Sequence, residues 1–226
     1  MVGTGYFPGG EEQAYLCERD SLCLVGTSEV SLTSIHAGET LKASDLPLRR
    51  IAVSPCYRRE AGTYGKDTKG LYRVHQFWKV EQVVIGPADE AWSREEHERM
   101  LGHATDLMDL LALPYRVVNV CTGDLGQGQV QKFDIETWMP SRGGYGETHS
   151  ASRFHDFQLR RLNLRYRPEG AGKPQFCHTL NNTVVASPRV LIALLENYQQ
   201  EDGSVLVPEA LQPYMGTSKI QASAVL

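Results

Sequence analysis

The chain has 226 residues, 41% of them hydrophobic, and a formal net charge of −4. This hydrophobic content allows a substantial buried core, and the acidic balance argues against a surface that binds nucleic acid over its whole extent. No hydrophobic run approaches the ~20 residues of a membrane span, and the first residues lack the charged and apolar regions of a signal peptide. The sequence therefore predicts a soluble, cytoplasmic protein without a membrane partner.

The chain is expected to form a single domain over residues 1–226, with residues 215–226 as a C-terminal tail. No internal repeat or low-complexity tract interrupts it. The cysteines form no C-x-x-C pair and lie far apart, so neither a disulfide framework nor a zinc site is indicated. They are expected to be small buried residues: Cys17, Cys23, Cys56, Cys121 and Cys177.

Short strands are expected near the N-terminus, at residues 15–16 and 22–25. Behind the second strand, Thr27 and Glu29 are two residues apart and face the same way, offering a hydroxyl and a carboxylate to an ammonium group. The same residues also suit the N-cap of a helix over residues 30–36. Both interpretations can hold together.

Two stretches of alternating apolar residues within residues 48–85 predict a β-hairpin joined by residues 61–70. Because side chains alternate between the faces of a strand, Arg58 and Glu60 share one face of the first arm. The second arm carries another such set: Arg73, Phe77 and Glu81. These groups suit a nucleotide triphosphate together with an amine. The alternative is a solvated hairpin with ordinary ion pairs across its strands.

Beyond the hairpin, helical spacing predicts helices over residues 87–113, 154–164 and 188–200. His97 and His103 lie among charged residues of the first of these helices and are expected at the surface. Strands are expected over residues 115–120, 132–139, 176–180 and 205–207.

Residues 141–146 are expected to be a flexible connection into Glu147 and Ser150. These two residues are three apart, so they face the same way only if the strand contains a bulge or ends there. Their oxygens are hard ligands of the kind that Mg²⁺ accepts beside phosphate. A plain structural loop is the alternative.

The last predicted helix carries Ser187 as its cap and Arg189 in its first turn. An arginine opposes the helix dipole at this position, which an anionic ligand would explain. A solvent-exposed arginine is the alternative.

These stretches, read in order, resemble the catalytic domain of bacterial seryl-tRNA synthetases, which are class II aminoacyl-tRNA synthetases. The resemblance covers nearly the whole chain. It rests on GTSEV at 26–30, YRREAG at 57–62, RVHQF at 73–77, KVE at 79–81, ETHS at 147–150, DFQ at 156–158, RRLN at 160–163, TLN at 179–181 and LENYQQEDG at 195–203.

The resemblance implies an α+β fold, an antiparallel sheet flanked by helices, on which L-serine and ATP form seryl-adenylate before serine is transferred to tRNA(Ser). It implies Arg58 and Arg189 as catalytic residues and Mg²⁺ on Glu147 and Ser150. Serine would be bound by Thr27, Ser28, Glu29, Glu81, Asn181 and Thr183. ATP would be bound by Arg58, Arg59, Glu60, Arg73, Val74, Phe77, Glu147, Thr148, His149, Ser150 and Arg189.

Individual roles also follow from the resemblance. Arg58 would bind the α-phosphate, and Glu60 would hold the adenine amino group. Phe77 would stack under the base and Arg189 over it. Glu81 and Thr183 would contact the serine hydroxyl, while Thr27 and Glu29 would lie near the ammonium group.

The chain also departs from the family pattern. The N-terminal arm that grips tRNA and class motif 1, which builds the homodimer interface, are not in this sequence, so residue 1 falls inside the catalytic domain. Impaired activity and weak tRNA charging are therefore expected, and a homodimer is not assigned. The alternative is a non-catalytic, synthetase-derived binding or regulatory paralogue. Residues 181–186 also lack the glycines of the commoner form of motif 3.

Overall fold

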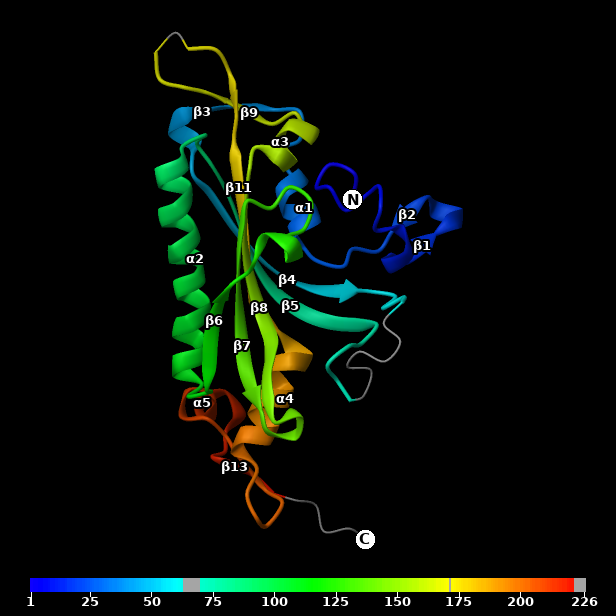
Figure 1. Ribbon diagram of the computed structural model, residues 1–226, viewed down its shortest axis with the longest axis vertical. Helices are drawn as coiled ribbons and strands as arrows, with labels where there is room; N and C mark the ends of the chain where they lie inside the picture. Colours follow the sequence, from blue (N-terminus) through cyan, green and yellow to red (C-terminus); the bar gives the residue numbers. More distant parts are fainter. Residues whose placement is uncertain (63–69, 171, 222–226) are drawn as a thin grey trace.

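A six-stranded antiparallel sheet forms the centre of the molecule (Figure 1). The computed structural model describes residues 1–62, 70–170 and 172–221. The strands run in the order β4 (Leu48–Tyr57), β5 (Gln76–Gly86), β11 (His178–Ala186), β8 (Gly144–His155), β7 (Gln131–Met139) and β6 (Tyr115–Asn119). Every neighbouring pair is antiparallel. The predicted α+β class and the predicted β4–β5 hairpin are thus confirmed; part of its connection lies outside the described residues.

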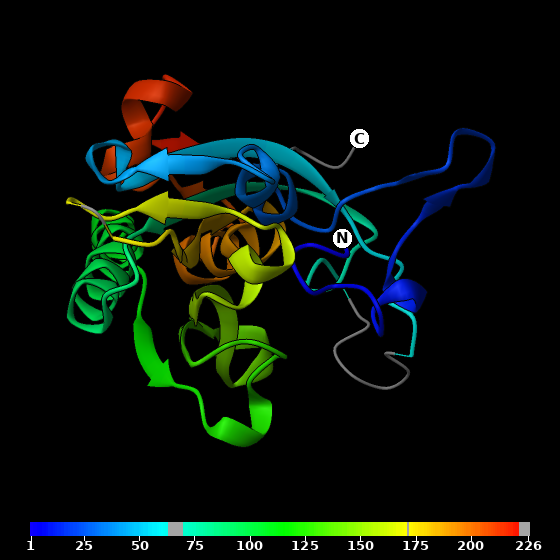
Figure 2. The same ribbon diagram turned by 90° about the horizontal axis from the view of Figure 1, so that it is seen from above.

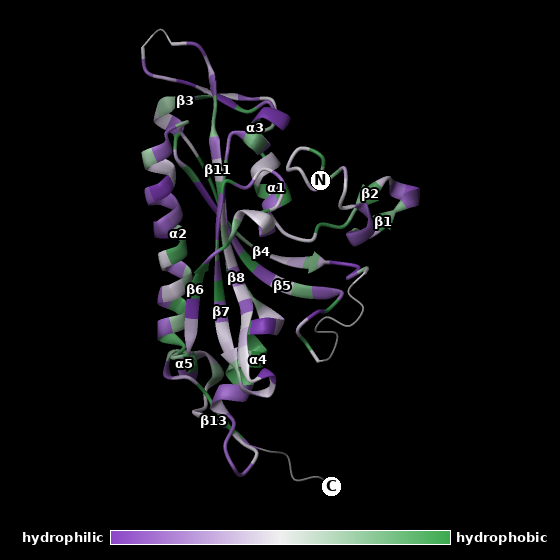
Figure 3. Cartoon of the chain, viewed as in Figure 1, coloured by the Kyte–Doolittle hydropathy of each residue, from purple (hydrophilic) through white to green (hydrophobic). Residues whose placement is uncertain are grey.

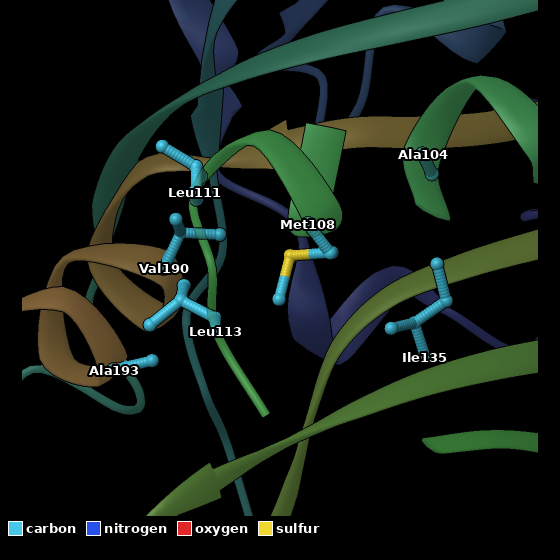
Figure 4. Packing of buried hydrophobic residues seen from close by; sticks show 7 residues of the cluster. All are labelled: Ala104, Met108, Leu111, Leu113, Ile135, Val190 and Ala193. Carbon is cyan, nitrogen blue, oxygen red and sulfur yellow. The ribbon is translucent and has the colours of Figure 1, made fainter. Parts of the chain in front are cut away.

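Two long helices, α2 (Glu90–Leu110) and α4 (Ser187–Tyr198), share one hydrophobic core with the sheet. Figure 4 shows Met108 of α2 between Ile135 of β7 on one side and Val190 and Ala193 of α4 on the other. Figure 3 shows hydrophilic and hydrophobic residues alternating along α2, as expected for a helix that buries one face. Shorter helices are α1 (Glu29–Ser34), α3 (Phe157–Arg161) and α5 (Gln212–Met215).

The described residues also form three smaller sheets. Strands β1 (Leu16–Cys17) and β2 (Leu22–Cys23) form a hairpin that projects from the body of the molecule (Figure 2). The other two sheets consist of β10 (Gln175–Phe176), β9 (Arg165–Arg167) and β3 (Thr40–Lys42), and of β12 (Val205–Leu206) with β13 (Lys219–Ile220). Strand β13 lies in the segment expected to be a tail, so Lys219 and Ile220 of that segment pair with β12.

Short 3₁₀ helices connect these elements: Glu11–Gln13, Glu18–Asp20, Ala43–Asp45, Thr122–Asp124, Pro140–Arg142 and Glu209–Leu211. The helix predicted over residues 154–164 is shorter than expected, because Phe154 and His155 complete β8. The flexible connection predicted over residues 141–146 is also shorter, since β8 begins at Gly144.

Several local predictions were wrong because tertiary contacts decide them. Ser187 does not cap α4; its hydroxyl accepts a hydrogen bond from the Trp78 amide at 3.2 Å. His97 is 1% exposed and packs on the ring of Phe133, with 5.0 Å between ring centroids, while His103 is exposed as predicted. Among the cysteines, Cys56 and Cys177 are buried as predicted, but Cys17 and Cys23 are only half-buried and Cys121 is exposed.

A β-bulge lies in each of the two central strands that border the site. In β8, Ile135 pairs with His149 and Glu136 with Glu147, so Thr148 is the extra residue. In β11, the register shifts between Thr183 and Val185. Glu147 and Ser150 are three residues apart and can face the same side only if the strand contains a bulge, and the bulge in β8 meets this condition. Within the described part of the chain, no helix is long and apolar enough to span a membrane.

Candidate functional site

A cavity of about 480 Å³ gathers most of the predicted residues from segments that are distant along the chain. Its walls come from the N-terminal loop, α1, the β4–β5 hairpin, the paired strands β8 and β11, and the first turn of α4. The predicted residues that line it are Glu29, Arg58, Glu60, Arg73, Val74, Phe77, Glu81, Glu147, Thr148, His149, Ser150, Asn181, Thr183 and Arg189.

The other predicted residues lie outside this cavity. Thr27 lines a neighbouring cavity of about 380 Å³, and its hydroxyl accepts a hydrogen bond from the Glu29 amide at 3.2 Å. Ser28 is buried at the N-cap of α1. Arg59 is exposed, and its amide donates to the Gln13 carbonyl at 2.9 Å. Thr27 therefore bonds an amide in the first turn of α1, which agrees with its predicted alternative role at the start of a helix.

One end of the cavity carries a buried carboxylate with two donors on the same oxygen. The Thr183 hydroxyl donates to Glu81 Oε2 at 3.0 Å, and Lys79 Nζ lies 2.6 Å from that oxygen. Thr183 and Glu81 are direct register partners on β11 and β5. Because both carry polar groups able to bond a hydroxyl, this end suits a small ligand that bears one.

A second buried carboxylate, Glu29, lies in the same cavity and is 4% exposed. The Tyr6 hydroxyl donates to Oε2 at 2.8 Å, and the Gln158 amide donates to Oε1 at 2.6 Å. Burial, and next the negative charge of Glu81, raise the pKa of Glu29, which these two donors oppose. Burial and the nearby carboxylates raise the pKa of Tyr6 well above its usual value, so Tyr6 remains a donor at neutral pH.

The middle of the cavity combines a cation with an aromatic ring. The Arg58 guanidinium carbon lies 5.2 Å from the centroid of the Phe77 ring, and Arg58 Nε donates to the Gly26 carbonyl at 3.3 Å. Arg73 Nη1 lies 3.0 Å from Glu60 Oε2, which fixes that carboxylate at the cavity wall. An aromatic ring beside two guanidinium groups suits a base joined to phosphates.

The opposite wall is organised by Arg189. Its Nη1 donates to the Glu147 carbonyl at 2.9 Å and lies 3.3 Å from the Glu147 carboxylate. Its guanidinium carbon lies 4.4 Å from the centroid of the Tyr72 ring. Arg189 is thus held at the cavity rather than exposed to solvent, as the anionic-ligand interpretation requires.

The two residues expected to bind Mg²⁺ offer a carboxylate and a hydroxyl, Glu147 and Ser150, both at the cavity wall. In the part of the chain that the structure describes, no three His, Cys, Asp or Glu side chains gather as a metal cluster. Two hard oxygen donors fit an ion that keeps several waters and binds phosphate oxygens, as Mg²⁺ does.

The neighbouring Thr148 and His149 have structural contacts. The Thr148 hydroxyl lies 2.7 Å from the Thr137 hydroxyl and 2.8 Å from His149 Nδ1. Burial lowers the pKa of His149 to about 4, so this imidazole is neutral at physiological pH. The contacts of both residues therefore support the bulge that carries Glu147.

The sequence prediction missed four residues that shape the cavity: Tyr6, Tyr72, Lys79 and Gln158. Lys79 was detectable, because it shares strand parity with Phe77 and Glu81. Gln158 lies within a stretch that carries the resemblance, although no role follows from spacing. Nothing in the glycine-rich N-terminal stretch indicates that Tyr6 reaches Glu29.

Residues 15–198 match the tRNA synthetase class II core domain (G, H, P, S and T), and the chain belongs to this family. Two similar relatives within this family are serine–tRNA ligases. The Deinococcus radiodurans enzyme is 52% identical over 220 residues, covering 97% of this chain and 52% of that protein. The Pyrococcus furiosus enzyme is 50% identical over 218 residues, covering 96% of this chain and 48% of that protein.

Solved structures agree with this relationship. Seryl-tRNA synthetase from Pyrococcus horikoshii complexed with ATP matches with a TM-score of 0.93 and 48% identity, covering 98% of this chain and 49% of that one. Cytoplasmic serine–tRNA ligase from Naegleria fowleri in complex with AMP matches at 0.91 and 37% identity, covering 99% of this chain and 53% of that one. The chain thus spans about half the length of the relatives it matches.

Proposed function

We propose that this chain binds ATP and L-serine, joins them as seryl-adenylate with release of pyrophosphate, and serves the transfer of serine to tRNA(Ser). The observation that supports this proposal is the convergence of a hydroxyl-binding carboxylate, a second buried carboxylate and a guanidinium–aromatic pair in one cavity. The serine–tRNA ligase relatives and the ATP-bound P. horikoshii structure support the same substrates. No specific observation favours the non-catalytic alternative.

The amino acid would lie with its ammonium group near Glu29 and its hydroxyl between Glu81 and Thr183. Alanine lacks that hydroxyl and would leave these buried polar groups without a partner, which is the basis for strong rejection. In the reaction, a serine carboxylate oxygen attacks the α-phosphorus of ATP. The bond from that phosphorus to the bridging oxygen of the β-phosphate breaks, and pyrophosphate leaves.

Arg58 would stabilise the charge that develops on the α-phosphate, since nucleotidyl transfer depends mainly on positioning and electrostatics. Phe77 would support the base and Glu60 would bond its amino group, while Arg189 would cover the base from α4. Glu147 and Ser150 would hold Mg²⁺. When bound, that ion neutralises part of the triphosphate charge.

Serine-dependent exchange between ATP and pyrophosphate tests the adenylation step directly. We expect exchange with L-serine and at least about a hundredfold less with alanine, because a stranded buried polar group costs several kcal/mol. Arg58→Ala is expected to abolish exchange while a folded state is retained. A folded wild-type chain that shows no serine-dependent exchange would refute the proposal.

A panel of other amino acids provides the second arm of this experiment. Glycine and threonine probe the size of the pocket, and proline and histidine represent other class II substrates. If one of these supports faster exchange than serine, the chain is a ligase of different specificity. Transfer to tRNA(Ser) is then measured separately with purified tRNA.

A further inference from the structure

Lys79 is a buried cation at the centre of the amino-acid end of the cavity. It follows Phe77 and precedes Glu81 on the same face of β5, and its side chain is 7% exposed. A lysine ammonium group is almost never buried without a partner, because removing it from water costs several kcal/mol. Its position therefore needs an explanation in the charges around it.

The partners of Lys79 are the two groups that would receive the serine hydroxyl. Nζ lies 2.6 Å from Glu81 Oε2 and donates weakly to the Thr183 hydroxyl at 3.5 Å. Thr183 also donates to the same Glu81 oxygen. Among residues 1–62, 70–170 and 172–221, no group donates a hydrogen bond to Glu81 Oε1. The two donors on Oε2 thus hold the carboxylate in one orientation and leave Oε1 as an acceptor.

Charge gives Lys79 a second effect. Glu29 and Glu81 are 4% and 2% exposed, and the negative charge of Glu81 adds to burial in raising the pKa of Glu29. Besides Glu81, the titratable or charged groups that act on Glu29 are Tyr6 from the N-terminal loop and Lys79 from β5, while Arg58, directly after β4, acts on Tyr6. With Glu29, Glu81 and Lys79 ionised, the buried set carries a net charge of −1, which one ligand ammonium group balances.

We propose that Lys79 is a positioning residue of this pocket, holding Glu81 toward a ligand hydroxyl and balancing the two carboxylates so that one cationic amine is accepted. The inference rests on the proposed function, because it deepens the serine pocket. Lys79 touches no reacting atom; it acts through Glu81 and Glu29. A purely structural lysine would instead affect folding without changing ligand preference.

The test measures binding of two non-hydrolysable sulfamoyl analogues, of seryl-adenylate and alanyl-adenylate, by calorimetry from pH 5 to 9. In Lys79→Met we expect the preference for the seryl analogue to fall by roughly tenfold or more, the cost of a lost charge-assisted contact. In the wild type, the positive charge of Lys79 lowers the pKa of Glu29. As the pH falls, we therefore expect Glu29 to be protonated, and seryl binding to weaken, at a higher pH in Lys79→Met than in the wild type.

Two further variants separate charge from structure. Lys79→Gln keeps a donor to Glu81 but removes the charge. The pH below which the seryl analogue binds weakly, its acid limit, is therefore expected to rise in this variant, even if Lys79→Met fails to fold. Lys79→Arg keeps the charge and is expected to have the same acid limit as the wild type. The matched control is Lys219→Met, which breaks an exposed ion pair with Asp202 far from the pocket residues in sequence.

The outcomes distinguish this inference from the proposed function. A wild-type chain that binds neither analogue overturns both. If the wild-type chain prefers the seryl analogue and Lys79→Gln shows the same preference and the same acid limit, only the role of Lys79 is overturned. Equal upward shifts in Lys79→Gln and Lys79→Arg would likewise contradict the charge argument.

Discussion

Tyr72 places an aromatic ring beside two guanidinium groups. The guanidinium carbons of Arg142 and Arg189 each lie 4.4 Å from its ring centroid. The Tyr72 carbonyl also accepts from Arg189 Nε at 3.3 Å, and its hydroxyl donates to the Glu147 carbonyl at 3.3 Å. Tyr72 therefore fixes the guanidinium that would cover the base, at the wall that carries Glu147.

We expect Tyr72→Ala to raise the KM for ATP about three- to tenfold, because a cation–π contact contributes about 0.5–2 kcal/mol. The KM for serine is expected to stay within about twofold in the same exchange assay. Tyr72→Phe keeps the ring and is the matched control, expected to resemble the wild type. If Tyr72→Phe were as impaired as Tyr72→Ala, the hydroxyl and not the ring would be responsible.

Residue spacing predicts single strands well and contacts between distant segments poorly. Alternation correctly put Phe77 and Glu81 on one face, since it depends only on the period of a strand. Burial of His97 against Phe133 depends on how α2 packs, which its charged sequence neighbours do not reveal. The Tyr6–Glu29 hydrogen bond joins residues 23 positions apart, with no local pattern to indicate it.

At the scale of elements, the start of α2 is tied to β8 by an ion pair. Glu90 Oε2 lies 2.7 Å from Arg153 Nη1 and 2.5 Å from His155 Nε2, and Arg153 is 2% exposed. The hydrogen bond from Arg153, together with its charge, lowers the pKa of Glu90 to about 2. The buried guanidinium would lose its carboxylate partner if Glu90 were replaced.

Glu90→Gln is expected to lower the free energy of unfolding by about 1–3 kcal/mol at pH 7. This range lies below the full cost of breaking a buried pair, because Glu90 is 45% exposed and partly screened by solvent. Its folded pKa lies below the unfolded value. The stabilisation is therefore complete above about pH 4.5 and is lost as the pH falls through about 2.

Urea unfolding at pH 7, 4 and 2.5 measures this difference between Glu90→Gln and the wild type. The control is Arg94→Gln, which removes the exposed ion pair at 2.7 Å on the other Glu90 oxygen and is expected to cost under about 1 kcal/mol. A difference between Glu90→Gln and the wild type that stays constant across the three pH values would contradict the ion-pair argument.

Elements were predictable to the extent that their periodicity is local. The β4–β5 hairpin and α2 follow from alternation and helical spacing, with boundaries adjusted by a few residues. From the sequence, a bulge near Glu147 could be named only as a requirement for Glu147 and Ser150 to face the same side. The bulge at Thr148 is a register shift against β7, so it depends on how the two strands pair. The short α3 has the same cause: Phe154 and His155 are taken by β8.

At the scale of the whole molecule, the sheet brings together segments that are distant along the chain. Glu29 on α1, Glu81 on β5, Glu147 on β8 and Arg189 on α4 line one cavity. A ligand that spans this cavity contacts each of these elements in the folded state and cannot do so in the unfolded chain. Ligand binding should therefore stabilise the entire fold, not only the loops around the site.

A seryl-adenylate sulfamoyl analogue at a hundred times its Kd is expected to add about 2.7 kcal/mol to the free energy of unfolding. For a domain of this size, that corresponds to a rise in Tm of roughly 5–10 °C, measured by scanning calorimetry. AMP reaches only part of the cavity, so at the same concentration it should bind less completely and give a smaller shift.

Glu81→Gln is the matched control: it removes the charge beside Lys79 and Thr183, and its shift with the seryl analogue should fall toward that of AMP. Equal shifts from AMP and the seryl analogue in the wild type would mean that the amino-acid end of the cavity contributes no binding energy.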